Sequence, residues 1–221
     1  LVRIETAALN RRDLYITKGQ YPGIQCPVTL GSDGYGEVVE APGDMTDWIG
    51  EKVVLCPSLD WGDSEIHQGP NYNILGLPRD GTFAQYTTVP TEALFRAPSH
   101  LTPEQAAALP LAGLTAWRAL MTRGCLRAED RVLITGMGGG VALMALQLAL
   151  AHHADAFVTS GHPRKLEAAN NLGAIGGALY TETDWHRALT KDIKGGFDLI
   201  IDGAGGEDFG RLVRILNPGG R

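Results

Sequence analysis

The chain has 221 residues and a net charge of −6, and 44% of its residues are hydrophobic while 20% are charged. This composition is typical of a globular protein and excludes a disordered tail or a fibrous repeat. Without a basic stripe or a long apolar run, neither nucleic acid nor a membrane is expected as a partner. The three cysteines lack the paired spacing of a disulfide framework, which predicts free thiols in a reducing cytoplasm.

The first 98 residues are predicted to form a small, irregular β-barrel or sandwich. Short runs of β-forming residues occur at 2–8, 37–40, 52–56, 83–89 and 93–96, and Gly, Pro, Asp and Asn separate them. Glycine is abundant, with 29 residues in the chain, and its lack of a period favours a fold with many tight turns.

A helical pattern begins after residue 101. Thr102, Pro103 and Gln105 form a capping box, in which the threonine caps the helix and the proline takes its first position. Residues 106–121 are rich in Ala and Leu, so we expect one helix that continues until Gly124 ends it.

Strands and helices then alternate to the end of the sequence. Strands are predicted at residues 131–135, 156–159, 178–180 and 197–202, and helices at residues 141–152, 164–172, 184–193 and 208–216. This order predicts an α/β fold with a doubly wound parallel sheet over residues 99–221. A further strand is expected after Arg221 and the first residue is not methionine, so we expect part of a longer protein.

A glycine-rich turn joins the first of these strands to its helix. A dinucleotide's pyrophosphate needs backbone N–H groups at a helix N-terminus, and glycine leaves that approach open. The strict G-x-G-x-x-G pattern fails at its last position, whereas a shifted pattern ends on the small residue Ala142. We predict a dinucleotide site, with a tight turn without ligand as the alternative. Its predicted cofactor-binding residues are Gly136, Gly138, Gly139, Gly140 and Val141.

The end of the second strand favours NADPH over NADH. An NAD site usually places an acidic residue there for the ribose hydroxyls, and none is present. Ser160, Arg164 and Lys165 follow instead, and a hydroxyl and two cations suit a 2′-phosphate. The alternative is that the two cations only form the solvated first turn of a helix, where they are mildly unfavourable.

Taken together, these motifs resemble the medium-chain dehydrogenase/reductase superfamily. The matching stretches are residues 8–13, 19–22, 30–36, 80–84 and 106–117 and the glycine turn, and they follow the family's order. In particular, the chain resembles the zinc-free quinone oxidoreductase-like branch, whose members are often named zinc-binding alcohol dehydrogenase family proteins. The resemblance implies a GroES-like catalytic domain over residues 1–98 and a Rossmann domain over residues 99–221, both incomplete, and a dimer or tetramer of the full-length protein.

The resemblance also implies that no zinc is bound. Many relatives bind a catalytic zinc at positions that match Asn10, Ser32 and Leu111, where this chain has neither thiolate nor imidazole. The four-cysteine structural lobe is also missing from residues 60–73. Without a metal to polarise an oxygen, a conjugated acceptor is easier to reduce than a simple carbonyl, because conjugation spreads the developing charge.

The predicted activity is therefore hydride transfer from NADPH to a small quinone or α,β-unsaturated carbonyl compound. An alcohol dehydrogenase of the same superfamily is one alternative, and a non-catalytic NADPH-binding sensor or partner-binding protein is another. The first hypothesis predicts turnover of a quinone or enone, and the second predicts turnover of an aliphatic alcohol. The third predicts NADPH binding without turnover of any acceptor.

The candidate catalytic residues also come from the resemblance. It places Asn10, Asp13 and Tyr21 in the wall of the cleft, and Thr115 near the nicotinamide or its phosphates. Asn10 is either a hydrogen-bond donor to the substrate or an ordinary turn residue, and Asp13 either orients it or caps a helix. Tyr21 either meets the substrate or packs in its loop, and Thr115 either meets the cofactor or bonds its own helix. Asp33, in a glycine-rich turn, is a further candidate.

Overall fold

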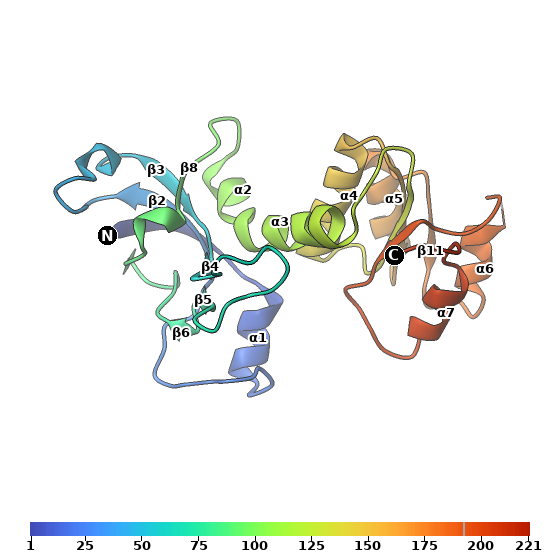
Figure 1. The fold of residues 1–221 in the computed structure, drawn as a ribbon, viewed down its shortest axis with the longest axis horizontal. Helices are drawn as coiled ribbons and strands as arrows, with labels where there is room; N and C mark the ends of the chain where they lie inside the picture. Colours follow the sequence, from blue (N-terminus) through green and yellow to red (C-terminus); the bar gives the residue numbers. More distant parts are fainter. Residues whose placement is uncertain (192) are drawn as a thin grey trace. The chain divides into compact units, whose positions relative to one another are not determined.

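The computed structural model describes residues 1–191 and 193–221 (Figure 1). Two compact units divide the chain, Leu1–Leu111 and Ala112–Arg221. The expected boundary between residues 98 and 99 lies before helix α2 (Pro103–Ala107), which the first unit includes. That boundary stays a prediction about the domains of the family.

The main sheet of the first unit has five strands in the order β7-β1-β2-β3-β8, all paired antiparallel. Alternate residues point to opposite faces of a strand, so Val2 enters the core while Arg3 beside it stays exposed. The first strand confirms the expected run 2–8, whereas the second begins at Asp33, before the expected residues 37–40. The bounds are β1 Val2–Ala8, β2 Asp33–Val38, β3 Lys52–Leu55, β7 Tyr86–Thr87 and β8 Leu94–Arg96.

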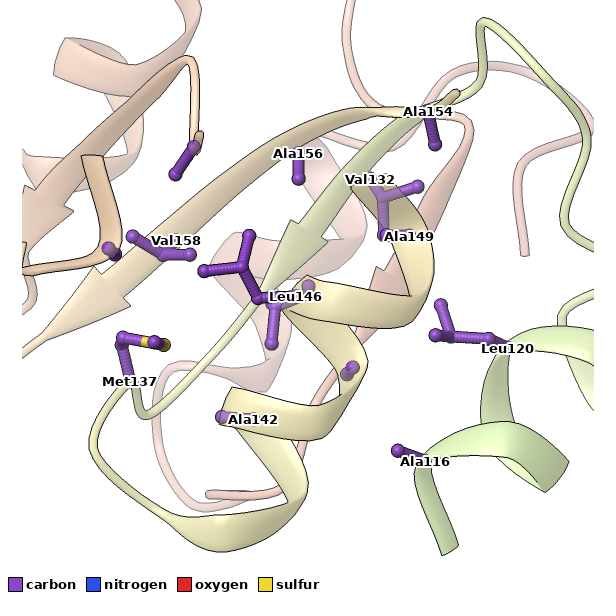
Figure 2. Packing of buried hydrophobic residues seen from close by; sticks show 14 of the residues in the cluster. Ala116, Leu120, Val132, Met137, Ala142, Leu146, Ala149, Ala154, Ala156 and Val158 are labelled. Carbon is purple, nitrogen blue, oxygen red and sulfur yellow. The ribbon is translucent and has the colours of Figure 1, made fainter. Parts of the chain in front are cut away.

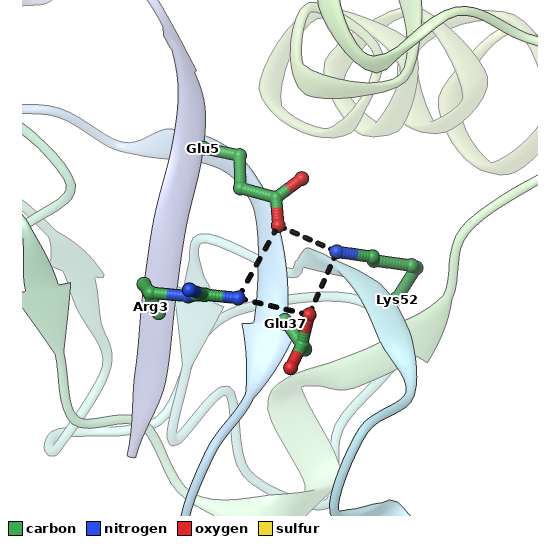
Figure 3. A network of polar contacts seen from close by, with 4 residues as sticks. All are labelled: Arg3, Glu5, Glu37 and Lys52. Atoms are coloured by element: carbon green, nitrogen blue, oxygen red, sulfur yellow. Dashed lines mark hydrogen bonds and ion pairs between the residues drawn. The ribbon is translucent and has the colours of Figure 1, made fainter.

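Charged side chains link the outer face of the same strands (Figure 3). Glu37 accepts from Arg3 at 3.0 Å and from Lys52 at 2.8 Å, and Lys52 also reaches Glu5 at 2.5 Å. The hydrogen bond from Lys52 lowers the pKa of the Glu37 carboxyl. Exposed ion pairs contribute little to stability, so this network marks the solvent face rather than holding the sheet together.

Short elements surround that sheet. Helix α1 (Arg11–Thr17), which the sequence analysis does not predict, begins after Asn10 and buries Ile16. The capping box of α2 is confirmed, because Thr102 and Gln105 exchange hydrogen bonds. The remaining elements are the three-stranded sheet β4 (Ser58–Leu59), β5 (Asn73–Leu75) and β6 (Pro78–Arg79), and the 3₁₀ turns Thr46–Trp48 and Thr91–Ala93.

The expected single helix over residues 106–121 is wrong. The structure divides it into α2, α3 (Pro110–Trp117) and a π-helical turn (Arg118–Arg123). Proline has no N–H to donate and disfavours helical geometry in the residue before it, so α2 ends before Pro110. Gly124 ends the last turn as expected, and its N–H donates to the carbonyl of Ala119 at 2.8 Å.

The second unit contains a four-stranded parallel sheet in the order β11-β10-β9-β12. The predicted alternation of strands and helices is confirmed, and this order is typical of a doubly wound dinucleotide-binding fold. The expected helix at 184–193 is shorter, and residue 192 lies outside the described residues. The strands are β9 Arg131–Ile134, β10 Asp155–Ser160, β11 Gly176–Leu179 and β12 Leu199–Ile201, and the helices are α4 Gly140–Ala151, α5 Pro163–Leu172, α6 Trp185–Thr190 and α7 Phe209–Arg214.

Both faces of this sheet are covered by apolar side chains. On one face, Ala142 and Leu146 of α4 pack against Val132 and Val158 of the sheet (Figure 2). On the other face, a second cluster forms around Leu133 of β9. A strand that is buried on both faces needs apolar residues at consecutive positions. This explains the sequence Val-Leu-Ile in β9, before the glycine turn.

Candidate functional site

The glycine turn lies at the point of the second unit where a doubly wound sheet binds its ligand. It follows β9, which has β10 on one side and β12 on the other, so the direction of winding reverses there. Gly136 and Gly138 have φ angles of +72° and +108°, which residues with a side chain rarely adopt. Gly139 is the N-cap of α4 and Gly140 its first residue, so the turn ends on the positive end of a helix dipole.

Residues at the end of β10 hold this turn in place. The backbone N–H of Met137 donates to the carbonyl of Thr159 at 2.7 Å. The hydroxyl of Ser160 donates to the carbonyl of Met137 at 3.1 Å, and Ser160 is buried. Ser160, predicted to contact the cofactor, therefore uses its hydroxyl hydrogen to shape the turn.

Lys165 extends over the glycine turn from the first turn of α5. A Cβ atom built on Gly138 would lie 2.6 Å from its Cδ and 2.8 Å from its Nζ, so the flexible end of this lysine lies directly over Gly138. Arg164, beside it, is exposed, and Val141 is half-buried in the first turn of α4. Two cations near a positive helix end are unfavourable unless an anion joins them. These residues fit the phosphates of a dinucleotide.

Thr135 and Asp202, which the sequence analysis did not select, connect the two sides of the same edge. The hydroxyl of Thr135 donates to Asp202 Oδ1 at 2.6 Å, and the N–H of Gly203 donates to that hydroxyl at 3.2 Å. Asp202 also accepts from the N–H of Gly205. The sequence signal for this pair is an aspartate followed by glycines at the end of a predicted strand. The carboxyl ends of parallel strands lie at the same edge of the sheet, so Asp202 could have been expected near the glycine turn.

In the first unit, the predicted catalytic residues Asn10 and Asp13 lie at the start of α1. The N–H of Asn10 donates to Asp13 Oδ2 at 2.8 Å, which satisfies the helix end from the third helical position. Asp13 therefore caps the helix, as one of the two alternatives expected. The side chain of Asn10 makes no cap hydrogen bond, and its Nδ2 donates to Asp33 Oδ2 at 2.9 Å.

Asp33 is a buried acid with two N–H partners. Its Oδ1 accepts from the N–H of Leu111 at 2.8 Å and its Oδ2 accepts from Asn10. Burial raises the pKa of Asp33 to about 6, and the neighbouring Asp13 also raises it, while the two hydrogen bonds and Arg12 oppose the shift.

The residues at the matched metal positions do not fit a zinc ion. The hydroxyl of Ser32 donates to the carbonyl of Leu75 at 2.7 Å and accepts from Arg12 Nη1 at 2.6 Å, so a second cation would face the guanidinium. Leu111 offers no ligand atom in its side chain, and zinc requires about four N, S or O donors. In residues 1–191 and 193–221, no three His, Cys, Asp or Glu side chains are grouped closely enough to hold a metal.

The other two catalytic candidates belong to different units. Tyr21, in the first unit, is half-buried, and the guanidinium of Arg12 lies 5.0 Å from the centre of its ring. Thr115 is exposed on α3 in the second unit. Arg12 is another residue that the sequence analysis missed, because a charged residue inside a polar run gives no sign of burial.

A glycine turn at the switch point of a parallel sheet, joined in one chain to a separate β-rich unit, defines a two-domain dinucleotide-binding protein. Comparison with known proteins gives the family. The model of the alcohol dehydrogenase GroES-like domain matches residues 1–99, and that of the zinc-binding dehydrogenase domain matches residues 140–221. The chain belongs to the medium-chain dehydrogenase/reductase superfamily, and the expected GroES-like and Rossmann-like domains are confirmed.

Individual relatives agree with this assignment. The zinc-type alcohol dehydrogenase-like protein YogA of Leptosphaeria maculans is 37% identical over all of this chain and 66% of its own length. A crystal structure of an NAD-dependent alcohol dehydrogenase is 35% identical, with a TM-score of 0.89 over 99% of this chain and 66% of that one. The quinone oxidoreductase from Coxiella burnetii is 28% identical, with a TM-score of 0.80 over 99% and 64%. The chain thus spans slightly less than two thirds of these relatives. In the part of the chain that is described, no helix is long and apolar enough to cross a membrane.

Proposed function

We propose that the full-length protein is an NADPH-dependent oxidoreductase that reduces a quinone or an α,β-unsaturated carbonyl compound without a metal. The observation that carries the cofactor assignment is the position of Lys165 over Gly138, beside a strand end that has no acidic residue. A 2′-phosphate would offset the cost of these cations, whereas the ribose of NADH needs a carboxylate that this segment lacks.

Two features of the first unit support the proposed acceptor class. The hydroxyl of Ser32 is hydrogen-bonded to Arg12 and to a backbone carbonyl, which does not suit a metal ligand. We therefore propose that no metal ion polarises the substrate oxygen. A bound nicotinamide would supply a hydride, and a conjugated acceptor takes it with the negative charge spread over several atoms. Asn10 retains one N–H for that oxygen, and the half-buried Tyr21 supplies a second polar group. A proton from water then completes the reduction.

A second candidate is an alcohol dehydrogenase that uses NADH. It is favoured by the match to a structure described as an NAD-dependent alcohol dehydrogenase, which is more similar to this chain than the quinone oxidoreductase is. The fit of the residues disfavours it, because Ser32 and Leu111 replace the donors that a catalytic zinc needs.

The test is a substrate panel with the full-length protein. Oxidation of NADPH and of NADH is followed with quinones, enones and aldehydes, and reduction of NADP⁺ and NAD⁺ is followed with aliphatic alcohols, with and without EDTA. Turnover of a quinone or enone with NADPH that survives EDTA supports the proposal. Turnover restricted to alcohols, or activity that disappears in EDTA and returns with zinc, contradicts it.

A further inference from the structure

Asn10 is held from two sides by buried carboxylates of the first unit. Asp13 accepts from its backbone N–H at 2.8 Å, and Asp33 accepts from its side-chain Nδ2 at 2.9 Å. The two carboxylates are only 5% and 1% exposed. The bond to Asp13 caps the helix, whereas the bond to Asp33 acts on the side chain of Asn10 itself. A buried acid bonded to one amide side chain indicates that the orientation of this side chain matters.

Asp33 is itself fixed in place. It is the first residue of β2, where it pairs with Ala8 of β1. Its backbone carbonyl accepts from the hydroxyl of Thr82 at 2.7 Å, and the N–H of Leu111 occupies its Oδ1 at 2.8 Å. Asn10 bonds to the other oxygen, Oδ2, so the bond from Leu111 also fixes the orientation of the carboxylate that Asn10 meets.

This arrangement costs stability. The guanidinium of Arg12 bonds to Ser32 and to the carbonyls of Leu75 and Leu77, while the partners of Asp33 are neutral N–H groups. A buried carboxylate with neutral partners is less favourable than an apolar residue of similar size. Groups that cost stability in this way are typical of functional sites.

We infer that Asp33 is a positioning residue for Asn10, an inference that rests on the proposed function. An ionised carboxylate accepts only from the nitrogen of an amide, so Asp33 fixes the nitrogen of Asn10 towards itself and the oxygen away from it. Asn10 then presents one N–H and one oxygen in a single orientation to the acceptor. Asp33 does not touch the substrate, and it acts through Asn10.

The variant Asp33→Asn reverses this orientation with almost no change in shape. The N–H of Leu111 is backbone and fixed, so the new amide must turn its oxygen to Leu111 and its NH₂ group to Asn10. Asn10 then has to rotate and present its own oxygen to that group. We expect kcat to fall by about 10- to 100-fold while KM for NADPH is unchanged.

A double-mutant cycle separates positioning from a general structural role. In an Asn10→Ala background, Asp33→Asn should change kcat by less than about twofold, because no amide is left to orient. An equal loss in both backgrounds would overturn the inference. Asp80→Asn is the matched control, since exposed Asp80 accepts from the N–H of Thr29 at 2.7 Å and should keep full activity. If Asp33→Asn fails to fold, Asp33→Glu keeps the charge and should lose activity only in the presence of Asn10.

A second measurement does not depend on turnover. Full-length protein labelled with [¹⁵N]asparagine should give side-chain NH₂ signals for Asn10, assigned by their loss in Asn10→Ala. These signals should move in Asp33→Asn and stay in place in Asp80→Asn. Unmoved signals in Asp33→Asn would refute the positioning role, whereas a wild-type protein that reduces no acceptor would refute only the proposed function.

Discussion

Replacement of Lys165 by alanine tests the cofactor assignment directly. A hydrogen bond to a charged group contributes about 1.5–3 kcal/mol, which corresponds to about 10- to 100-fold in affinity. Lys165 is exposed, so solvent screening places the expected effect near the lower end, at about tenfold. We therefore expect KM for NADPH to rise about tenfold and KM for NADH to change by less than twofold, with kcat for each cofactor nearly constant.

The assay is steady-state oxidation of both cofactors by the full-length variant at low and high salt. The preference for NADPH over NADH should decline with salt in the wild type and stay flat in Lys165→Ala. Arg187→Ala removes another exposed cation, on α6, which pairs with Asp184 at 3.8 Å, and should leave the preference unchanged. Equal losses with both cofactors would remove the case for a 2′-phosphate beside Lys165.

Three further variants test the turn, the buried acid and a close backbone approach. Gly138→Ala forces a side chain into a φ of +108° and should weaken NADPH binding by about tenfold or more in a fluorescence titration. The pKa of Asp33 is about 6 in the folded chain against an ordinary 3.8, so folding favours the protonated acid. Relative to Asp33→Asn, the free energy of unfolding should therefore fall by about 3 kcal/mol from about pH 3 to about pH 7 in urea titrations. In Gly81→Ala the new Cβ meets the carbonyl oxygen of Gly31, which should cost about 2 kcal/mol or more by thermal unfolding, while Gly43→Ala meets nothing within 4 Å and should cost little.

Each of these three predictions can be contradicted by a specific result. Unchanged NADPH affinity in Gly138→Ala would separate the turn from the cofactor. A stability difference between wild type and Asp33→Asn that is flat with pH would mean that folding does not raise the pKa of Asp33. Equal unfolding temperatures for the Gly81 and Gly43 variants would show that the backbone can move aside.

The second unit was predictable because its signals are local. Apolar runs, helix caps and a glycine turn each lie within a dozen or so residues, and their order alone predicts a parallel sheet. The same local information was misread at Pro110, where a missing N–H divides the expected helix into α2 and α3. One proline is enough to interrupt a helix in a stretch whose Ala- and Leu-rich composition favours one.

The environment of Asn10 could not be read from the sequence. Asn10 meets Asp33, which lies 23 residues away, and Arg12 meets Leu75, which lies 63 residues away. Such contacts depend on how β1, β2 and the small sheet fold together, and polar residues in a turn carry no signal of burial. The resemblance to a family selected Asn10 and Asp13, but the role of the buried Arg12 and Asp33 needed the structure.

The central claim is that the turn from Gly136 to Gly140 binds the phosphates of NADPH in a protein that needs no metal. Phosphorus NMR of NADPH added to the full-length protein in EDTA tests it most directly. The account predicts that the pyrophosphate and 2′-phosphate signals both shift on binding, and that Lys165→Ala reduces the shift of the 2′-phosphate alone. Signals that stay at their free positions, or that shift only after zinc is added, would contradict it.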